Sequence, residues 1–217
     1  PLTVGLALTD QDRKAIYYNP QGRDVLIKTL ALQGLNQAKS LAKFGLPVIV
    51  FVDDPGLYAS GQSTFITLKK EEIITELNSI YDGIQHAGAV AGTHSCAGMD
   101  WSILFESKVD IVSFDAFNYF TSVVSYIDEL KGFMDRGGCL AWGIVPTNAE
   151  QLVHQNVDSL EAVLNEHFAY LERKGFDREV LIRQAMITPS CGTGTLPLEL
   201  AFGAHEFTKN LAQKLRG

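Results

Sequence analysis

Residues 139–145, "CLAWGIV", are seven consecutive residues without a charge, with two glycines before them and Pro146 after them. A short apolar run between turn signals is typical of a strand buried on both faces of a parallel sheet. Five other runs have the same character, and we expect a strand in each: "LTVGLAL" (2–8), "VIVFVDD" (48–54), "GAVAGTH" (88–94), "VDIVSFD" (109–115) and "RQAMITP" (183–189).

Segments with helical spacing of apolar residues separate these runs, which gives about six β-then-α units. We expect helices over residues 21–44, 68–87, 101–107, 119–135, 149–173 and 197–215. This alternation predicts a parallel sheet covered by helices, either an open doubly wound sheet or a barrel. The first turn from strand to helix lacks a glycine-rich phosphate motif, so we favour a (β/α)₈-type barrel. We expect one domain over residues 1–217, incomplete and lacking the first barrel strands.

Composition restricts the partners of this 217-residue chain. The net charge is −7 without a cluster of Lys or Arg, which argues against nucleic acid or an anionic membrane as a partner. Apolar runs stay below the roughly 18 residues of a membrane span. Three cysteines make a disulfide framework improbable and favour a cytoplasmic protein. The chain starts at Pro1 inside a strand-like run, so we expect its natural start upstream, and exposed edge strands then predict homo-oligomers.

Residues with metal-binding side chains lie at or just after the ends of several expected strands. His94 ends the strand at 88–94 and Cys96 comes two residues later, Asp115 ends the strand at 109–115, and Cys191 follows the strand at 183–189. The carboxyl ends of barrel strands meet on one face, where barrel enzymes have their active sites. Imidazole, thiolate and carboxylate are the ligands of zinc. The sequence therefore predicts a zinc site made of His94, Cys96, Asp115 and Cys191.

Structural roles for the same residues remain open at this point. Asp115 can cap the next helix, and cysteines are common in apolar cores. Asp53 and Asp54 precede Pro55 and can simply form a turn. The stretch "YASGQST" (58–64) is either a mobile active-site loop or a plain surface loop.

Four motifs, in chain order, carry a resemblance to a known family. They are "VFVDDPGL" (50–57), "THSCAGMDW" (93–101), "VDIVSFD" (109–115) and "PSCGTGTL" (189–196). With them the chain resembles the catalytic C-terminal domain of cobalamin-independent methionine synthase, in the uroporphyrinogen decarboxylase and methionine synthase superfamily. It is most similar to the short relatives that lack the N-terminal half.

The resemblance implies a zinc-dependent methyltransferase that binds a thiol, homocysteine, as a zinc-bound thiolate and methylates it to methionine. It makes His94, Cys96 and Cys191 zinc ligands and places Asp115 where the family has a glutamate ligand. Asp53 stands where the family has the acid that holds the amino group of the amino-acid thiol.

One departure concerns the methyl donor. The family's Asp-Ile-His-Ser stretch appears here as "WGIVPT" (142–147), with Val145 in place of the histidine that serves acid catalysis with folate. The missing histidine puts a folate donor in question. A methylated corrinoid protein needs no such acid, so we expect the methyl donor to be either a corrinoid protein or a folate. Three alternatives stay open: a methylcobamide-to-thiol methyltransferase with another acceptor such as coenzyme M, a uroporphyrinogen decarboxylase-like enzyme, and a non-catalytic barrel, either with a structural zinc or as a zinc-free binding module.

Overall fold

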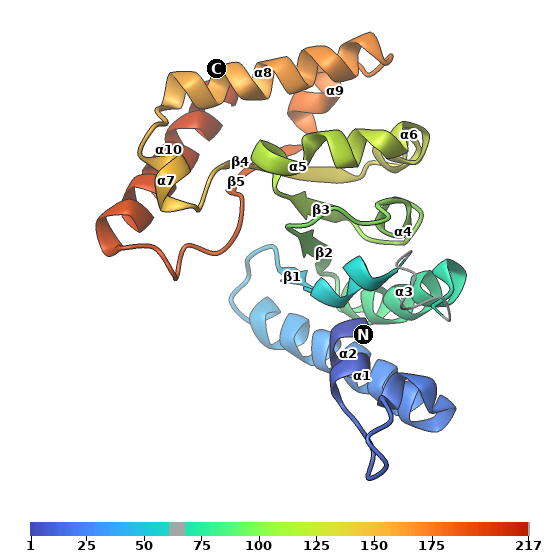
Figure 1. Ribbon diagram of the computed structural model, residues 1–217. Coiled ribbons are helices and arrows are strands. Elements are labelled where there is room, and N and C mark those ends of the chain that lie inside the picture. Colours follow the sequence, from blue (N-terminus) through green and yellow to red (C-terminus); the bar gives the residue numbers. More distant parts are fainter. Residues whose placement is uncertain (61–67, 217) are drawn as a thin grey trace. The chain divides into compact units, whose positions relative to one another are not determined.

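The computed structural model describes residues 1–60 and 68–216 (Figure 1). Residues 61–64 of the predicted loop at 58–64 lie outside these ranges. The strands are β1 (Ile49–Phe51), β2 (Val90–Ser95), β3 (Ile111–Phe114), β4 (Cys139–Val145) and β5 (Ala185–Pro189). The α-helices are α1 (Leu2–Ala7), α2 (Pro20–Ala42), α3 (Lys70–His86), α4 (Ser102–Phe105), α5 (Ala116–Val123), α6 (Ile127–Asp135), α7 (Ala149–Leu152), α8 (Val157–Arg173), α9 (Arg178–Arg183) and α10 (Leu198–Arg216). Within the two described ranges, the short 3₁₀ helices are η1 (Ile16–Tyr18), η2 (Pro55–Ala59) and η4 (Val124–Tyr126).

The five strands of the described residues form one parallel sheet in the order β1-β2-β3-β4-β5. β1 pairs parallel with β2, and β4 pairs parallel with β5, where Trp142 lies opposite Ile187. Each of the five strands predicted from residue 48 onward is therefore confirmed, and the chain is an α/β protein. Each strand is as long as the predicted run or shorter.

The prediction of a strand over residues 2–8 is wrong, since α1 occupies Leu2–Ala7. A continuous apolar run has no period that distinguishes strand from helix. The helix is favoured by a partner far along the chain: the Asp54 carboxylate accepts the backbone N–H groups of Leu2 and Thr3, both at 2.7 Å. These are donors of the first helical turn, which have no partner within the helix. The described residues thus contain five strands, one fewer than predicted.

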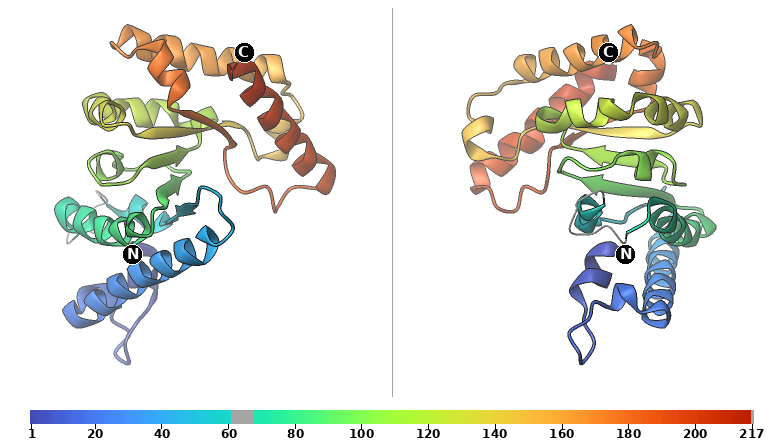
Figure 2. Two further views of the ribbon diagram at one scale, coloured as in Figure 1. Left: turned by 180° about the vertical axis from the view of Figure 1, so that it is seen from behind. Right: turned by 45° about the vertical axis from the view of Figure 1, so that its right-hand side comes forward.

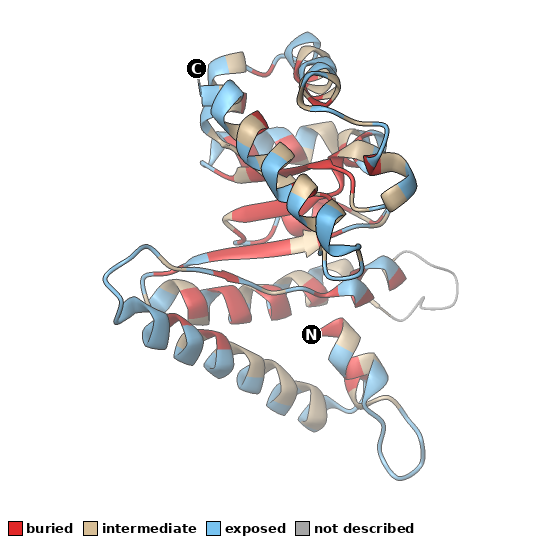
Figure 3. Cartoon of the chain, turned by 90° about the vertical axis from the view of Figure 1, so that its left-hand side faces the viewer, coloured by how far each residue is buried: buried red, intermediate tan, exposed pale blue. Residues whose placement is uncertain are grey.

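The chain divides into two compact units, Pro1–Val112 and Ser113–Gly217. In the first unit α2 and α3 lie side by side (Figures 1 and 2). A Cβ on Gly83 of α3 would lie 2.6 Å from a backbone oxygen of α2, so a glycine is required for this close approach. Ile73, Leu77, Ile80 and Ile84 recur at intervals of three and four and are at most 2% exposed. Buried and exposed bands accordingly alternate along this helix (Figure 3).

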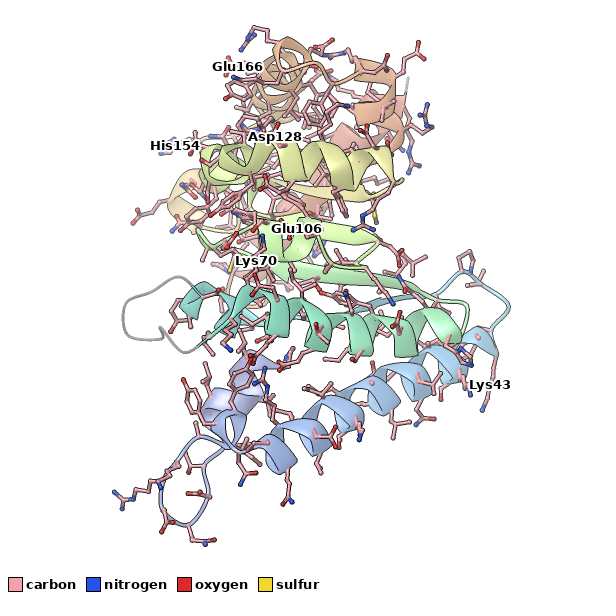
Figure 4. All side chains as sticks on the ribbon, turned by 90° about the vertical axis from the view of Figure 1, so that its right-hand side faces the viewer. Lys43, Lys70, Glu106, Asp128, His154 and Glu166 are labelled. Carbon is pink, nitrogen blue, oxygen red and sulfur yellow. The ribbon has the colours of Figure 1, made fainter. Side chains whose placement is uncertain are left out.

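An ion pair connects α3 to the segment after α4 in the same unit. The Lys70 Nζ atom lies 2.6 Å from a carboxylate oxygen of Glu106, and the two side chains point toward each other (Figure 4). Both side chains are partly exposed, so we expect a contribution to stability of at most about 1 kcal/mol. The apolar face of α3 therefore dominates the packing here.

In the second unit α8 packs against β4. Leu160, Leu164, Phe168 and Leu171 form the buried stripe of α8, and the Trp142 ring meets the Phe168 ring edge-on at 5.1 Å between centroids. β4 is buried from Leu140 to Val145, as its apolar sequence predicts.

Two predicted helices are interrupted in the structure. The helix expected over 149–173 is α7 followed by α8, because Asn156 starts a new helix with a capping box that includes Ser159. The helix expected over 119–135 begins earlier, at Ala116, and consists of α5, η4 and α6. Helix α9 was not predicted. It precedes β5, whose expected start at residue 183 moves to Ala185.

Among the described residues, no helix combines the length and apolar character that a membrane crossing requires.

Candidate metal centre

The end of β2 carries the histidine and the first of the candidate cysteines. Along an extended strand, residues two apart point to the same face. Thr93 points toward α3, because its Oγ1 atom lies 2.7 Å from the Tyr81 hydroxyl. His94 therefore points to the opposite face of the strand. His94 is half-buried, and Cys96, the residue directly after β2, is exposed.

The second cysteine follows β5 in a segment that is fixed to β4. Ser190 donates its backbone N–H to the Val145 oxygen at 2.8 Å, which extends the pairing of the two strands by one residue. The buried Ser190 hydroxyl accepts the Thr147 backbone N–H at 3.1 Å. These bonds hold the chain at the carboxyl ends of both strands, and the half-buried Cys191 comes next.

The described residues contain one group of His, Cys, Asp or Glu side chains that can hold a metal ion: His94, Cys96 and Cys191. One imidazole and two thiols form a donor set suited to zinc. Catalytic zinc sites have three protein ligands and one exchangeable position, whereas structural sites have four protein ligands. The donor types of this group therefore fit zinc.

Asp115, the fourth predicted ligand, is not a member of that group and has a structural role. It is 6% exposed and is the N-cap residue of α5. Its Oδ1 atom accepts the Asn118 backbone N–H at 2.9 Å, and its Oδ2 atom accepts the Asn118 side-chain N–H at 2.8 Å. The helix-cap role that the sequence left open is thus present, and ligation by Asp115 stays a prediction.

Asp53 and Asp54, the two acids after β1, have different environments. Asp53 is exposed and lines a cleft beside β1, together with Gln33 and Gln37 of α2. Asp54 is 1% exposed, and it accepts the first N–H groups of α1 and the Thr3 hydroxyl. An exposed carboxylate in a cleft can pair with an ammonium group, which keeps Asp53 as the candidate substrate residue. The role of Asp54 in fixing α1 was missed, because nothing in the local sequence indicates a partner some 50 residues away.

Cys139 differs from the two candidate ligands. It is the first residue of β4, at the opposite end of that strand from Val145, and burial raises the pKa of its thiol to about 11. A thiol with a raised pKa is a poor metal ligand, since the thiolate is the form that binds. Cys139 is therefore a control residue for tests of Cys96 and Cys191.

No protein-family model matches this chain, and no curated protein is similar enough to it to count as a match.

Proposed function

We propose that this chain is part of a (β/α)₈-type barrel and acts as a zinc-dependent methyltransferase whose acceptor is a thiol, homocysteine. The observation that carries the proposal is the group of His94, Cys96 and Cys191. Each of these residues belongs to the carboxyl end of a strand or follows one within two residues, which is where barrel enzymes have their active sites.

The strand order supports a barrel over a doubly wound sheet. In the order β1-β2-β3-β4-β5, each strand is next to its predecessor in the chain. A doubly wound sheet reverses its order at a switch point, and its ligand binds there. Sequential order without a reversal is the arrangement of a barrel, in which the loops after all strands contribute to one site.

Zinc, when bound, holds a substrate thiol as a thiolate near neutral pH and so supplies the nucleophile. The chain's residues have three tasks around it. His94 must be neutral, and Cys96 and Cys191 must be deprotonated, to act as ligands. The Asp53 carboxylate binds the ammonium group of the amino-acid thiol and orients its sulfur for attack on the methyl group in line. Val145, an apolar residue at the end of β4, offers no proton to a leaving group. A methylated corrinoid protein is therefore a better donor than a folate.

The test is the zinc content of the protein purified without chelator. We expect about one zinc per chain in the wild type, as for a mononuclear site. Cys96→Ser and Cys191→Ser each lose the metal, while Cys139→Ser keeps it. A folded wild-type protein without zinc, or equal zinc in all three cysteine variants, contradicts the proposed site.

A second measurement separates the alternative functions. Methylcobalamin serves as donor, and the methylation of homocysteine is compared with that of coenzyme M. We expect Asp53→Asn to raise the KM for homocysteine about tenfold, which corresponds to the loss of one charge-assisted contact. Coenzyme M has no ammonium group, so its KM should not change. A structural zinc would stay bound without methyl transfer to either thiol.

A further inference from the structure

The strand β1 has backbone groups that no described residue binds. It is the first strand in the sheet order, and its partner among the described residues is β2 (Figure 1). In a parallel pair, alternate residues of a strand direct their N–H and C=O groups to the neighbouring strand. The Val52 N–H donates to the Gly92 oxygen at 2.8 Å, which fixes that alternation. The backbone groups of Ile49 and Phe51 therefore point away from β2, to the outer edge of the sheet.

The side chains along this edge are apolar and partly exposed. Ile49 and Phe51 are each 41% exposed, whereas Val50 between them is buried, so the exposed pair lies on one face of the strand. Natural edge strands are protected from pairing by a charged side chain, a proline or a bulge. Residues 48–52 contain neither a charge nor a proline, and β1 pairs with β2 without a shift in register. The outer edge of β1 thus remains able to pair.

A cleft beside this edge restricts the kind of molecule that can bind there. It has a volume of about 200 Å³ and is lined by residues 50–53 and, from α2, by Leu30, Gln33, Gly34 and Gln37. Clefts that hold drug-sized ligands measure about 300–1,000 Å³, so this one is small. An added strand lies only about 4.8 Å from its neighbour and needs little width. The cleft therefore suits one extended chain better than a compact ligand.

The surroundings of the cleft determine which side chains such a strand can carry. Successive side chains of a strand alternate between its two faces. Those on the face of Ile49 and Phe51 meet apolar groups, and those on the side of α2 meet the Gln33 and Gln37 amides. The exposed Asp53 adds a negative charge just after β1. A fitting segment alternates apolar and small polar residues and has a cationic residue near Asp53.

We propose that the outer edge of β1 binds an extended segment of another protein, which adds one strand to the sheet and places a lysine or arginine beside Asp53. Hydrogen bonds to the backbone groups of Ile49 and Phe51 supply the affinity, and the alternating side chains supply the selectivity. Strand addition satisfies the row of free donors and acceptors, which a compact ligand cannot match. The proposal involves no metal and is independent of the proposed methyltransferase function.

The probe is the amidated peptide Lys-Val-Thr-Val-Thr-Val-Lys with fluorescein at its amino end, titrated with the protein as purified and followed by fluorescence anisotropy. A lysine at each end brings an ammonium group near Asp53 in either strand direction. We expect saturable binding to the wild type, together with slower hydrogen exchange of the Ile49 and Phe51 N–H groups. The Val50 N–H should not change, because it already faces β2. Absence of binding, or binding without slower exchange at Ile49 and Phe51, overturns the proposal.

Two variants of one residue block the edge by different means. Ile49→Pro removes an N–H that points away from β2 and so leaves the pairing of β1 with β2 intact. Ile49→Lys keeps every backbone group and adds the charge that protects natural edge strands. We expect each to raise the Kd of the probe about tenfold or more, as for the loss of one hydrogen bond or apolar contact.

Leu32→Lys is the matched control for these variants. Leu32 is 64% exposed on α2 and is not among the residues that line the cleft, so this change also places a lysine on an exposed apolar position. Its Kd for the probe should equal that of the wild type. A similar loss of binding in Leu32→Lys and in folded Ile49→Lys, or no loss in either Ile49 variant, refutes the edge as the binding site.

Two N-methylated probes distinguish strand pairing from general apolar adhesion. Methyl groups on the valine nitrogens block one edge of the peptide, and methyl groups on the threonine nitrogens block the other. Strand addition uses one edge, so one of these probes should bind and the other should fail. Equal binding of both contradicts strand addition.

The charge at Asp53 and the alternative of self-association are tested separately. Asp53→Asn should raise the Kd of the lysine probe about threefold, as for an exposed ion pair, and leave unchanged that of a probe with serine in place of lysine. An equal effect on both probes contradicts the cationic contact. If sedimentation shows a dimer that Ile49→Lys dissociates, and the probe does not bind, the edge pairs with a second copy and the proposed partner is wrong.

Discussion

The imidazole of His167 predicts a specific dependence of stability on pH. His167 lies in α8, where its Nδ1 atom is buried without a hydrogen-bond partner among the described residues. Its ring stacks on Phe120 with 3.9 Å between centroids and 12° between planes, and Trp142 lies beyond at 6.2 Å. Burial lowers the pKa of His167 from 6.5 to about 4, because an imidazolium in this apolar stack loses its hydration.

The direction in which pH changes the stability follows from comparing proton binding to His167 in the folded and the unfolded chain. As the pH falls, the unfolded chain binds a proton at His167 near pH 6.5, whereas the folded chain binds it near pH 4. Protonation therefore favours unfolding: the free energy of unfolding is highest above pH 6.5, falls between these two values, and no longer changes below them. The shift corresponds to at most about 3 kcal/mol, and screening of the partly exposed ring reduces this to about 2 kcal/mol.

The assay is urea unfolding of wild type and His167→Phe between pH 7.5 and pH 4. Phenylalanine keeps an aromatic ring in the stack but does not titrate. Other titrating groups are common to both proteins, so their difference isolates His167. We expect the variant to gain about 2 kcal/mol relative to the wild type over this range. Equal pH dependence of the two proteins, or a His167 pKa near 6.5 in a resonance titration, would refute the reasoning.

Two further predictions concern packing and charge. A Cβ on Gly143 would lie 2.5 Å from a backbone oxygen of β3, so Gly143→Ala should destabilise the fold by about 3 kcal/mol or more. Gly132→Ala in α6 meets no atom within 4 Å and should stabilise it by about 0.5–1 kcal/mol. Glu76 is 5% exposed and pairs with Arg23, so Glu76→Ala should lose about 3 kcal/mol by leaving a partly buried guanidinium with fewer partners. The more exposed Glu72 pairs with the same Arg23, and its replacement by alanine should cost clearly less than that of Glu76, because water screens the exposed pair. Urea unfolding gives the free energy of unfolding of all four variants. An equal change in the two glycine variants would contradict the packing argument, and an equal loss in the two glutamate variants would contradict the charge argument.

Cap residues mark several helix starts in the structure by local sequence alone. Asn19 before Pro20 starts α2, and its side chain accepts the first free N–H groups of the helix. The capping box at Asn156 is an equally local signal, and attention to it would have separated α7 from α8. Such signals depend on residues three or four apart, so they can be recognised without knowledge of the fold.

The candidate site was predicted only as far as strand ends are visible in the sequence. An apolar run ends where polar residues begin, which located His94, Cys96 and Cys191. The same reasoning located Asp115, yet only the structure shows that Asn118 holds both of its oxygens. Gln151, which orients Asn118, comes from the other side of β4 in the sequence, so no local pattern connects the two.

The sequence by itself determined the alternation of buried strands and amphipathic helices. A strand buried on both faces needs an uninterrupted apolar run, whereas a helix buried on one face needs apolar residues at intervals of three and four. It also determined which ligand types follow the strands. Only the tertiary structure decided that residues 2–7 form a helix, since the partner of the first N–H groups is Asp54, more than 50 residues later. Hydrogen bonds to distant side chains decide such cases, because they satisfy backbone groups that local sequence leaves without a partner.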